Sequence, residues 1–271
     1  MGPSTLPHVR ATINFAAPHD PRPEIHAHPP PEGQAARSAK PVRIEVPVHD
    51  VRSRREALCL DAEGLEIVPL SSAIDAKEAS ARGTALYAEA EASVAAATGA
   101  RRVVAFDHNV RSAPRSEAGE PGFQRPVRFA HNDYTESSGP QRVRDLLPDD
   151  AEALLQRRFA VINLWRPLGH PAEDVPLGVC DARSIRPEQL QPTALKYSDR
   201  TGEIYSLVHD SAQRWLYVPA LPPDEALLLK CYDSATDGRA RFTAHAAFRD
   251  PAARPEAPPR ESLEVRTLVF F

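Results

Sequence analysis

The stretch Val127-Arg-Phe-Ala-His-Asn-Asp133 predicts both the fold class and the chemistry of this chain. Its apolar and polar residues alternate as in a β-strand, where every second side chain, including those of His131 and Asp133, points to the same face. An imidazole and a carboxylate placed in this way can occupy adjacent positions of an octahedral metal ion. A second histidine from elsewhere would complete the facial triad of non-haem Fe(II) oxygenases. A His-x-Asp triplet is expected by chance ~0.6 times in such a chain, so the motif needs support from other residues.

His245 is the best candidate for the third ligand. It follows an apolar segment, residues 227–232, which is predicted to be a strand, and a turn through residues 233–238. Together, His131, Asp133 and His245 would leave three positions of the metal open. Dioxygen and a bidentate 2-oxo acid need such open positions.

Fifteen residues after His245, Arg260-Glu-Ser262 opens a further predicted strand, residues 263–271. Arg260, Ser262 and Arg266 share one face of this strand, and the opposite face is apolar. The polar face is either exposed to solvent or lines a barrel lumen, and the order and spacing of the motifs favour the lumen. A guanidinium can hold a carboxylate through two hydrogen bonds and a serine hydroxyl adds a donor, as anchoring 2-oxoglutarate requires.

The remaining pattern predicts one mainly β domain over residues 1–271, because barrels of this length commonly stay single. Residues 1–40 are rich in proline and predict an irregular arm. Residues 73–98 are rich in Ala and Glu and predict a helix with a left-handed C-cap at Gly99. Short strands are predicted at residues 42–46, 65–70 and 103–106, and a loop at residues 112–122.

Composition and charge narrow the possible classes of partner and the location of the protein. A formal net charge of -4 with 42% hydrophobic and 26% charged residues argues against a nucleic-acid or anionic-membrane partner and favours a small-molecule substrate. No apolar run of membrane-span length and no signal-peptide layout occurs, which predicts a cytoplasmic protein. The three separated cysteines predict reduced thiols without a role, and the sequence does not predict the oligomeric state.

Several segments together resemble the gibberellin desaturase and cephamycin 7α-hydroxylase (CmcJ-like) family. The similarity runs from about Val9 to the C-terminus. The segments are His131-Asn-Asp133, Phe106-Asp-His-Asn-Val-Arg111, Val161-Ile-Asn-Leu-Trp-Arg-Pro167, Pro176-Leu-Gly-Val-Cys-Asp-Ala-Arg-Ser184, Lys230-Cys-Tyr-Asp-Ser234, His245 and Arg260-Glu-Ser-Leu-Glu-Val-Arg266.

This resemblance implies a double-stranded β-helix with supporting helices, dependence on Fe(II), 2-oxoglutarate and O2, and hydroxylation or desaturation of a small secondary metabolite. It includes both Arg260 and Arg266, so the choice of co-substrate anchor stays open, with Arg260 favoured by its nearness to His245. Asp133 argues against halogenation, because related iron halogenases carry a small residue at this position. The substrate itself is not identified by a shared fold.

Two other classes of function remain possible on the residues alone. A cupin-like hydrolase or isomerase could hold Zn(II) or Mn(II) with the same three side chains, although Arg260 argues against it. A catalytically inactive barrel that binds a small molecule is the second, and the intact ligand set argues against that.

Candidate substrate-binding residues lie in the strand-like run 161–167. Asn163 and Trp165 are expected on one side of this strand and Arg166 on the other. Asn163 is the strongest of the three, because tryptophan is commonly buried in a core and arginine commonly forms structural ion pairs.

Overall fold

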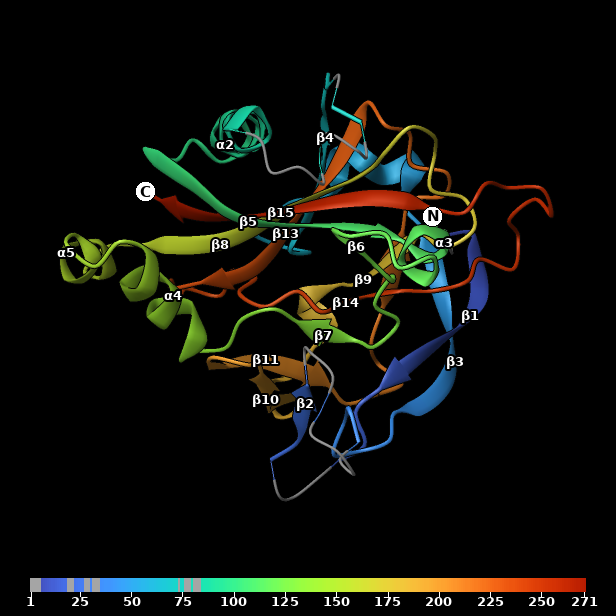
Figure 1. Ribbon diagram of the computed structural model, residues 1–271, viewed down its shortest axis with the longest axis horizontal. Helices are drawn as coiled ribbons and strands as arrows, with labels where there is room; N and C mark the ends of the chain where they lie inside the picture. Colours follow the sequence, from blue (N-terminus) through green and yellow to red (C-terminus); the bar gives the residue numbers. More distant parts are fainter. Residues whose placement is uncertain are drawn as a thin grey trace, which may run out of the picture.

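Two curled β-sheets make up most of the protein and lie one above the other in Figure 1. The computed structural model describes residues 6–18, 22–26, 30, 35–72, 74–75, 79 and 84–271. The six-stranded sheet has the order β4 (Leu65–Pro69), β13 (Glu225–Asp233), β8 (Phe159–Pro167), β15 (Glu261–Phe270), β5 (Arg102–Ser112) and β6 (Phe123–Gln124). The nine-stranded sheet has the order β1 (His8–Phe15), β3 (Val42–Asp50), β12 (Trp215–Tyr217), β9 (Leu177–Cys180), β14 (His245–Ala247), β7 (His131–Asn132), β11 (Thr201–Leu207), β10 (Leu190–Lys196) and β2 (Glu24–His26).

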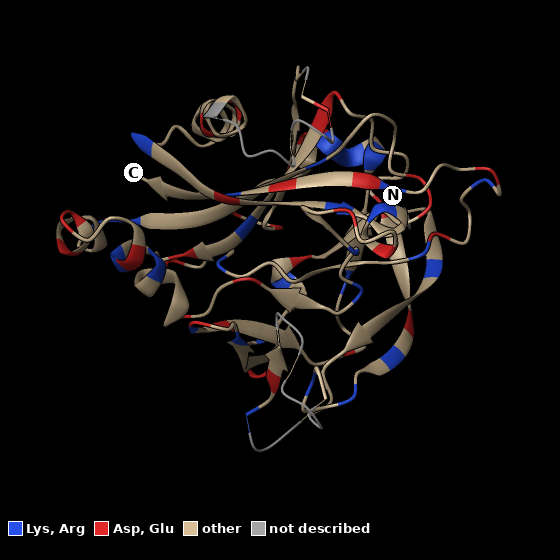
Figure 2. Ribbon diagram, viewed as in Figure 1, with Lys and Arg blue, Asp and Glu red and all other residues tan. Residues whose placement is uncertain are grey.

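Helices are few and short. The described helices are α2 (Thr84–Thr98), α3 (Ala113–Glu117), α4 (Ser138–Leu146), α5 (Ala151–Leu155) and the 3-10 turns η1 (Arg52–Ala57), η2 (Ala182–Ser184) and η3 (Pro187–Gln189). No helix in the described part of the chain is long and apolar enough to cross a membrane. Acidic and basic residues are interspersed over strands and loops (Figure 2), and all three cysteines are free, as predicted.

The six-stranded sheet is buried on both faces at its centre. Every residue of β8 is buried, which matches its nearly continuous apolar sequence. Alternate residues of β8 enter two different cores: Val161 and Trp165 pack between the two sheets, whereas Ile162 and Leu164 pack beneath α2. The strands predicted at residues 65–70, 103–106, 227–232 and 263–271 are confirmed as β4, β5, β13 and β15.

Helix α2 covers the outer face of this sheet, at the top of Figure 1. Leu86, Ala90 and Val94 recur every fourth residue and are buried against the strands. Gly99 follows the helix with a φ of 66°, so the predicted left-handed C-cap is confirmed. Most of the first half of the helix predicted over residues 73–98 lies outside the described residues.

The nine-stranded sheet curls so strongly that β1, at one end of the strand order, and the residue after it also form hydrogen bonds with residues at and near β7 and β11. The Asn14 and Ala16 backbone N–H groups donate to the carbonyls of Arg128 (3.3 Å) and Leu207 (2.8 Å). A third core, with Phe15 and Trp215 among its members, fills the inside of this curl. The inward face of β7 and β14 is therefore free to line the space between the two sheets.

Three local predictions need correction. Residues 1–40 are not an irregular arm throughout, because His8–Phe15 is strand β1, paired antiparallel with β3 over all eight residues. Burial of Ile13 and Phe15 stabilises that strand despite the surrounding prolines. The loop at residues 112–122 contains helix α3, with proline in its first turn. Within residues 127–133 only His131–Asn132 forms a strand, because Phe129 makes an isolated bridge to Asn14 instead of continuing β7.

Candidate metal centre

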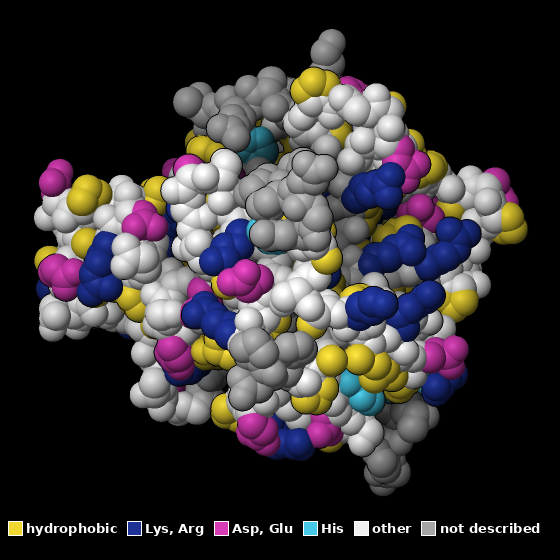
Figure 3. Space-filling model, turned by 60° about the horizontal axis from the view of Figure 1, so that its bottom comes forward, with side chains coloured by type: hydrophobic (Ala, Val, Ile, Leu, Met, Phe, Trp, Pro, Cys, Tyr) yellow, Lys and Arg dark blue, Asp and Glu magenta, His cyan; other side chains and the backbone are white. Residues whose placement is uncertain are grey.

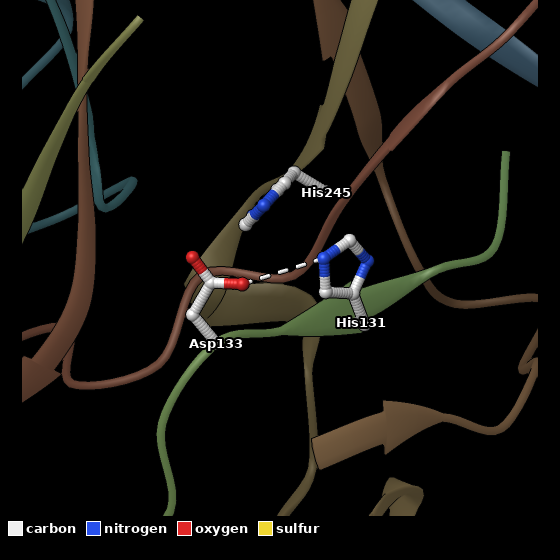
Figure 4. Close-up of side chains that lie close together, drawn as sticks. All are labelled: His131, Asp133 and His245. Carbon is white, nitrogen blue, oxygen red and sulfur yellow. Dashed lines mark ion pairs between the residues drawn. The ribbon is translucent and has the colours of Figure 1, made fainter. Parts of the chain in front are cut away.

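Strands β7 and β14 bring the two predicted histidine ligands together. His131 and His245 are register partners in this antiparallel pair, and their ring centroids are 4.7 Å apart. Asp133 follows the end of β7 and turns toward both rings (Figure 4). One potential ligand atom of each residue lies within 4.8 Å of the others. Residues far apart in the sequence therefore form one compact group of three donors.

Backbone carbonyls orient both imidazoles. Nδ1 of His131 is 2.8 Å from the Phe129 carbonyl oxygen, and Nδ1 of His245 is 3.1 Å from the Thr243 carbonyl oxygen. Since a carbonyl can only accept, Nδ1 carries the proton in each ring and Nε2 keeps its lone pair. Burial lowers the pKa of His245, and the charge of His131 adds to this effect, so His245 is neutral as a metal ligand must be.

Asp133 is held so that one carboxylate oxygen is left for a metal. Its Oδ2 accepts hydrogen bonds from Asn163 Nδ2 at 2.7 Å and from Arg266 Nε at 3.1 Å. Its Oδ1 lies 3.4 Å from His131 Nε2, near the ~3 Å separation of adjacent ligands with bonds of about 2.1 Å. Burial acts to raise the pKa of Asp133, but Arg266 and the histidines outweigh it and hold the pKa well below its ordinary value.

Arg266 is surrounded by acceptors. Besides Asp133, its guanidinium contacts Asp107 Oδ2 at 3.0 Å, Asn109 Oδ1 at 2.9 Å and Glu264 Oε1 at 3.2 Å. The neighbouring strand β5 supplies Asp107 and Asn109, because Asp107 is the register partner of Arg266 on β15, whereas Glu264 lies on β15 itself. The donors of Arg266 are therefore already committed to side chains of the protein.

Ser262 on β15 and Arg260, which directly precedes this strand, face inward like Arg266 but have free polar atoms. Both side chains are buried, so this face of the strand lines the lumen of the barrel and is not exposed to solvent. Arg260 Nη1 donates to the Val175 carbonyl oxygen at 2.7 Å, whereas Arg260 Nε and Ser262 Oγ are buried without a partner. Burial, and next the charge of nearby Arg111, lowers the pKa of Arg260 to about 9, so it is still a cation at neutral pH.

The structure separates the three predicted substrate-binding residues. Asn163 contacts Asp133 and donates to Glu264 Oε1 at 2.8 Å. Trp165 lies in the core between the sheets, with the Arg260 guanidinium 5.4 Å from its ring centroid. Arg166 lies on the opposite face of β8, where Nη2 donates to the Ile74 carbonyl oxygen at 2.7 Å. Arg166 is therefore not brought to the metal centre, because neighbouring side chains of a strand point to opposite faces.

Known proteins share this fold and sequence over nearly the whole chain. A family model described as "Oxidoreductase/YMDC permease-like domain" matches residues 13–270. The Fe(II)/2-oxoglutarate-dependent dioxygenase nvfI of Aspergillus novofumigatus is 35% identical over 249 residues, which cover 89% of this chain and 88% of the relative. The hydroxylase/desaturase efuI of Hormonema carpetanum is 31% identical over 248 residues and 83% of each chain. A solved structure of the iron and alpha-ketoglutarate-dependent endoperoxidase NvfI superposes with a TM-score of 0.87 at 30% identity, covering 97% of this chain and 98% of that one.

The chain belongs to the Fe(II)/2-oxoglutarate-dependent dioxygenase family. The prediction of a mainly β, double-stranded β-helix is confirmed by the two curled sheets and by this superposition. The relatives named above are a dioxygenase, an endoperoxidase and a hydroxylase/desaturase, which favours an oxygenase over the hydrolase or isomerase alternative.

Sequence analysis missed two polar residues, Asp107 and Asn109, that support the candidate metal centre of this dioxygenase. Asp107, Asn109 and Glu264 bind Arg266 or Asn163, which in turn hold Asp133. The alternation of Asp107, Asn109 and Arg111 along β5 was a usable signal, because three polar residues in succession on one face of a strand indicate a polar partner.

Proposed function

We propose that this protein is an Fe(II)- and 2-oxoglutarate-dependent dioxygenase that hydroxylates or desaturates a small molecule of secondary metabolism, with His131, Asp133 and His245 as the iron ligands. One observation carries the proposal. Two imidazoles with Nδ1 turned to backbone carbonyls present Nε2, and an ionised carboxylate presents Oδ1, toward one common point. This donor set of two nitrogens and one oxygen fits Fe(II) and leaves the opposite positions free.

We infer that Arg260 and Ser262 anchor the distal carboxylate of 2-oxoglutarate. The free Arg260 Nε and Ser262 Oγ are buried donors, and leaving such groups unpaired is costly. A bound carboxylate would satisfy both. Arg266 is the weaker candidate, because its guanidinium already contacts Asp133, Asp107, Glu264 and Asn109.

The protein's own residues would position the reactants and keep water out. O2 would be the oxidant and 2-oxoglutarate would supply two electrons on its conversion to succinate and CO2, with bound iron providing the site of this chemistry. Asn163 and Arg266 keep Asp133 in one orientation, which preserves the open positions of the metal. Trp165 shields the Arg260 side chain from solvent and so strengthens its attraction for a carboxylate.

Within the family, we assign this protein to the gibberellin desaturase and CmcJ-like enzymes, because the segments that resemble theirs extend from Phe106 to Arg266. We also predict that Asn163 and Trp165 contact the substrate. The single domain over residues 1–271, the cytoplasmic location and the absence of a nucleic-acid or membrane partner likewise stay predictions. Arg166 has no part in the proposed site, because it lies on the other face of β8.

The proposal predicts that the purified protein converts 2-oxoglutarate to succinate with Fe(II) and O2, and that a chelator stops the conversion. Asp133→Ala and His131→Ala should abolish succinate formation while circular dichroism stays near wild type. Arg166→Gln is the matched control and should keep succinate formation. Anaerobic addition of Fe(II) and 2-oxoglutarate should also give the weak visible charge-transfer band of a chelated 2-oxo acid. Succinate formation that survives metal removal, or full turnover by either alanine variant, would contradict the proposal.

A further inference from the structure

Arg111 on β5 faces the same interior space as Arg260 and Ser262. It is the register partner of Ser262 on β15, and directly opposed residues of neighbouring strands place their side chains on one face of the sheet. Ser262 Oγ is buried without a hydrogen-bond partner. The charge of Arg111 also acts on Arg260, where it adds to the effect of burial in lowering the pKa. These three side chains therefore form one group of hydrogen-bond donors.

The hydrogen bonds of Arg111 go to neutral acceptors. Its Nη1 donates to Gln124 Oε1 at 3.1 Å and to the Arg125 carbonyl oxygen at 3.0 Å, and its Nη2 donates to Asn109 Oδ1 at 3.4 Å. Its Nε has no acceptor in the described part of the chain. These contacts fix the direction of the guanidinium without neutralising its charge.

The carboxylates near Arg111 are already paired with another arginine. Three of them favour the charged form of Arg111 from a distance, and they belong to Glu264, Asp133 and Asp107. Each forms an ion pair with Arg266, at 3.2, 3.1 and 3.0 Å. Burial is the larger effect and lowers the pKa of Arg111. Among the residues that the structure describes, Arg111 is thus a partly buried cation without an ion pair of its own.

Two guanidinium groups beside an unpaired hydroxyl favour an anion that all three can bind. Keeping two cations close together away from water is unfavourable, and a carboxylate that accepts hydrogen bonds from both offsets this cost. Lys and Arg side chains also gather on the right-hand part of the face shown in Figure 3, where β10 and β11 come forward. Their positive potential attracts anionic ligands to the protein, and a dianion more strongly than a monoanion.

We propose that Arg111 is a second co-substrate-binding arginine, which holds the distal carboxylate of 2-oxoglutarate together with Arg260 and Ser262. The inference rests on the proposed dioxygenase function and deepens it, because two cations make the site selective for a 2-oxo acid that carries a second carboxylate. The donors come from β5 and from the start of the neighbouring strand β15. Arg266 stays outside this role, because its guanidinium is paired with carboxylates of the protein.

The test compares 2-oxoglutarate with 2-oxopentanoate, in which a methyl group replaces the distal carboxylate. Each is titrated anaerobically into the full-length protein with Fe(II), and the visible charge-transfer band measures binding without turnover. Arg111→Gln should weaken the binding of 2-oxoglutarate by about tenfold or more and leave that of 2-oxopentanoate within about twofold of wild type. Arg111→Lys keeps the charge but loses the fork of donors, and it should weaken 2-oxoglutarate binding by about threefold or more. Arg102→Gln is the matched control, because Arg102 lies at the other end of β5 and pairs with Asp150, and it should bind both acids as wild type does.

Wild-type affinity of Arg111→Gln for 2-oxoglutarate would overturn the inference. Equal weakening of both acids would also overturn it, because Arg111 would then only support the structure of the site. If Arg111→Gln does not fold by circular dichroism, Arg111→Lys decides, and wild-type affinity of that variant for 2-oxoglutarate would overturn the inference.

A wild type that gives no band with either acid would overturn the dioxygenase function instead. Calorimetric titration of glutarate into the metal-free protein then still tests Arg111 as a carboxylate-binding residue. Glutarate binding should weaken in Arg111→Gln and stay unchanged in Arg102→Gln, and equal affinity of wild type and Arg111→Gln would overturn the role of Arg111.

Discussion

At the scale of single residues, Arg266 of β15 and Arg260, which directly precedes that strand, both face inward but differ in what surrounds them. Arg266 contacts four acceptor side chains, among them Asp133, whereas Arg260 keeps a buried Nε without a partner. A guanidinium saturated by the protein orients its neighbours, and one with a free donor can bind a ligand. The same residue type therefore supports two different tasks on one strand.

This difference predicts opposite effects for two matched substitutions. Arg260→Leu should weaken 2-oxoglutarate binding by about 2–5 kcal/mol, because one partner of a buried charge pair is removed. Arg266→Leu should instead lower Fe(II) affinity by roughly 10–100-fold, because Asp133 loses one of its two hydrogen-bond donors. Anaerobic calorimetric titrations of metal and of co-substrate measure the two effects separately. The reverse ranking would make Arg266 the co-substrate anchor.

At the scale of elements, α2 shows how a helix with few large apolar residues is stabilised by packing against a sheet. Leu86, Ala90 and Val94 form a narrow buried stripe against the outer face of β5, β8 and β15. The inner faces of β8 and β15 carry Asn163 and Arg266, so the helix supports the strands that position Asp133. Packing on one face of the sheet thus contributes to the geometry of the site on the other.

Leu86→Ala should destabilise the protein by about 2–5 kcal/mol, because a buried leucine leaves a cavity that the sheet cannot fill. Urea unfolding followed by circular dichroism measures the loss. Leu146→Ala at the end of α4 is the matched control, because this leucine is 36% exposed, and its change should stay within about 0.5 kcal/mol. Equal effects of the two substitutions would show that α2 does not depend on this stripe.

At the scale of the whole molecule, Asp181 connects segments around β9 and β12. It is buried and accepts hydrogen bonds from Arg183 Nη2 at 2.8 Å and Arg214 Nε at 3.1 Å. Burial acts to raise the pKa of Asp181, but these hydrogen bonds outweigh it and hold the pKa below its ordinary value. A carboxyl with a lowered folded-state pKa stabilises the fold above its unfolded-state pKa, and that stability disappears as the pH falls through the folded-state pKa.

Asp181→Asn should therefore destabilise the metal-free protein by about 1–3 kcal/mol at pH 7. The difference from wild type should shrink as the pH falls below the ordinary carboxyl pKa of about 4. Urea unfolding at pH 7, 5 and 3.5 measures this dependence, with the exposed Asp199→Asn as control. A difference that stays constant with pH would mean that Asp181 acts through packing and not through its charge.

Much of the fold follows from local sequence pattern. The continuous apolar runs of β8 and β13, the alternating run of β15 and the Ala-rich helix ending at Gly99 were all predicted, because each pattern depends on neighbouring residues. The family resemblance predicted the double-stranded β-helix. Strand β1 was not predicted, because its partner β3 is distant and prolines obscure its pattern.

The sequence by itself determined the set of chemical groups: two histidines, one aspartate and an Arg-x-Ser motif at the start of a strand. Only the tertiary structure decided their roles. Arg266 is committed to Asp107 and Asn109 because β5 is the neighbour of β15. Arg37 reaches Phe129 because β2 pairs with β10 as the edge strand of the sheet and bridges to the chain at Arg37. The physical reason is that side-chain alternation is local, whereas the partner of a charged group depends on strand order and register, which are long-range.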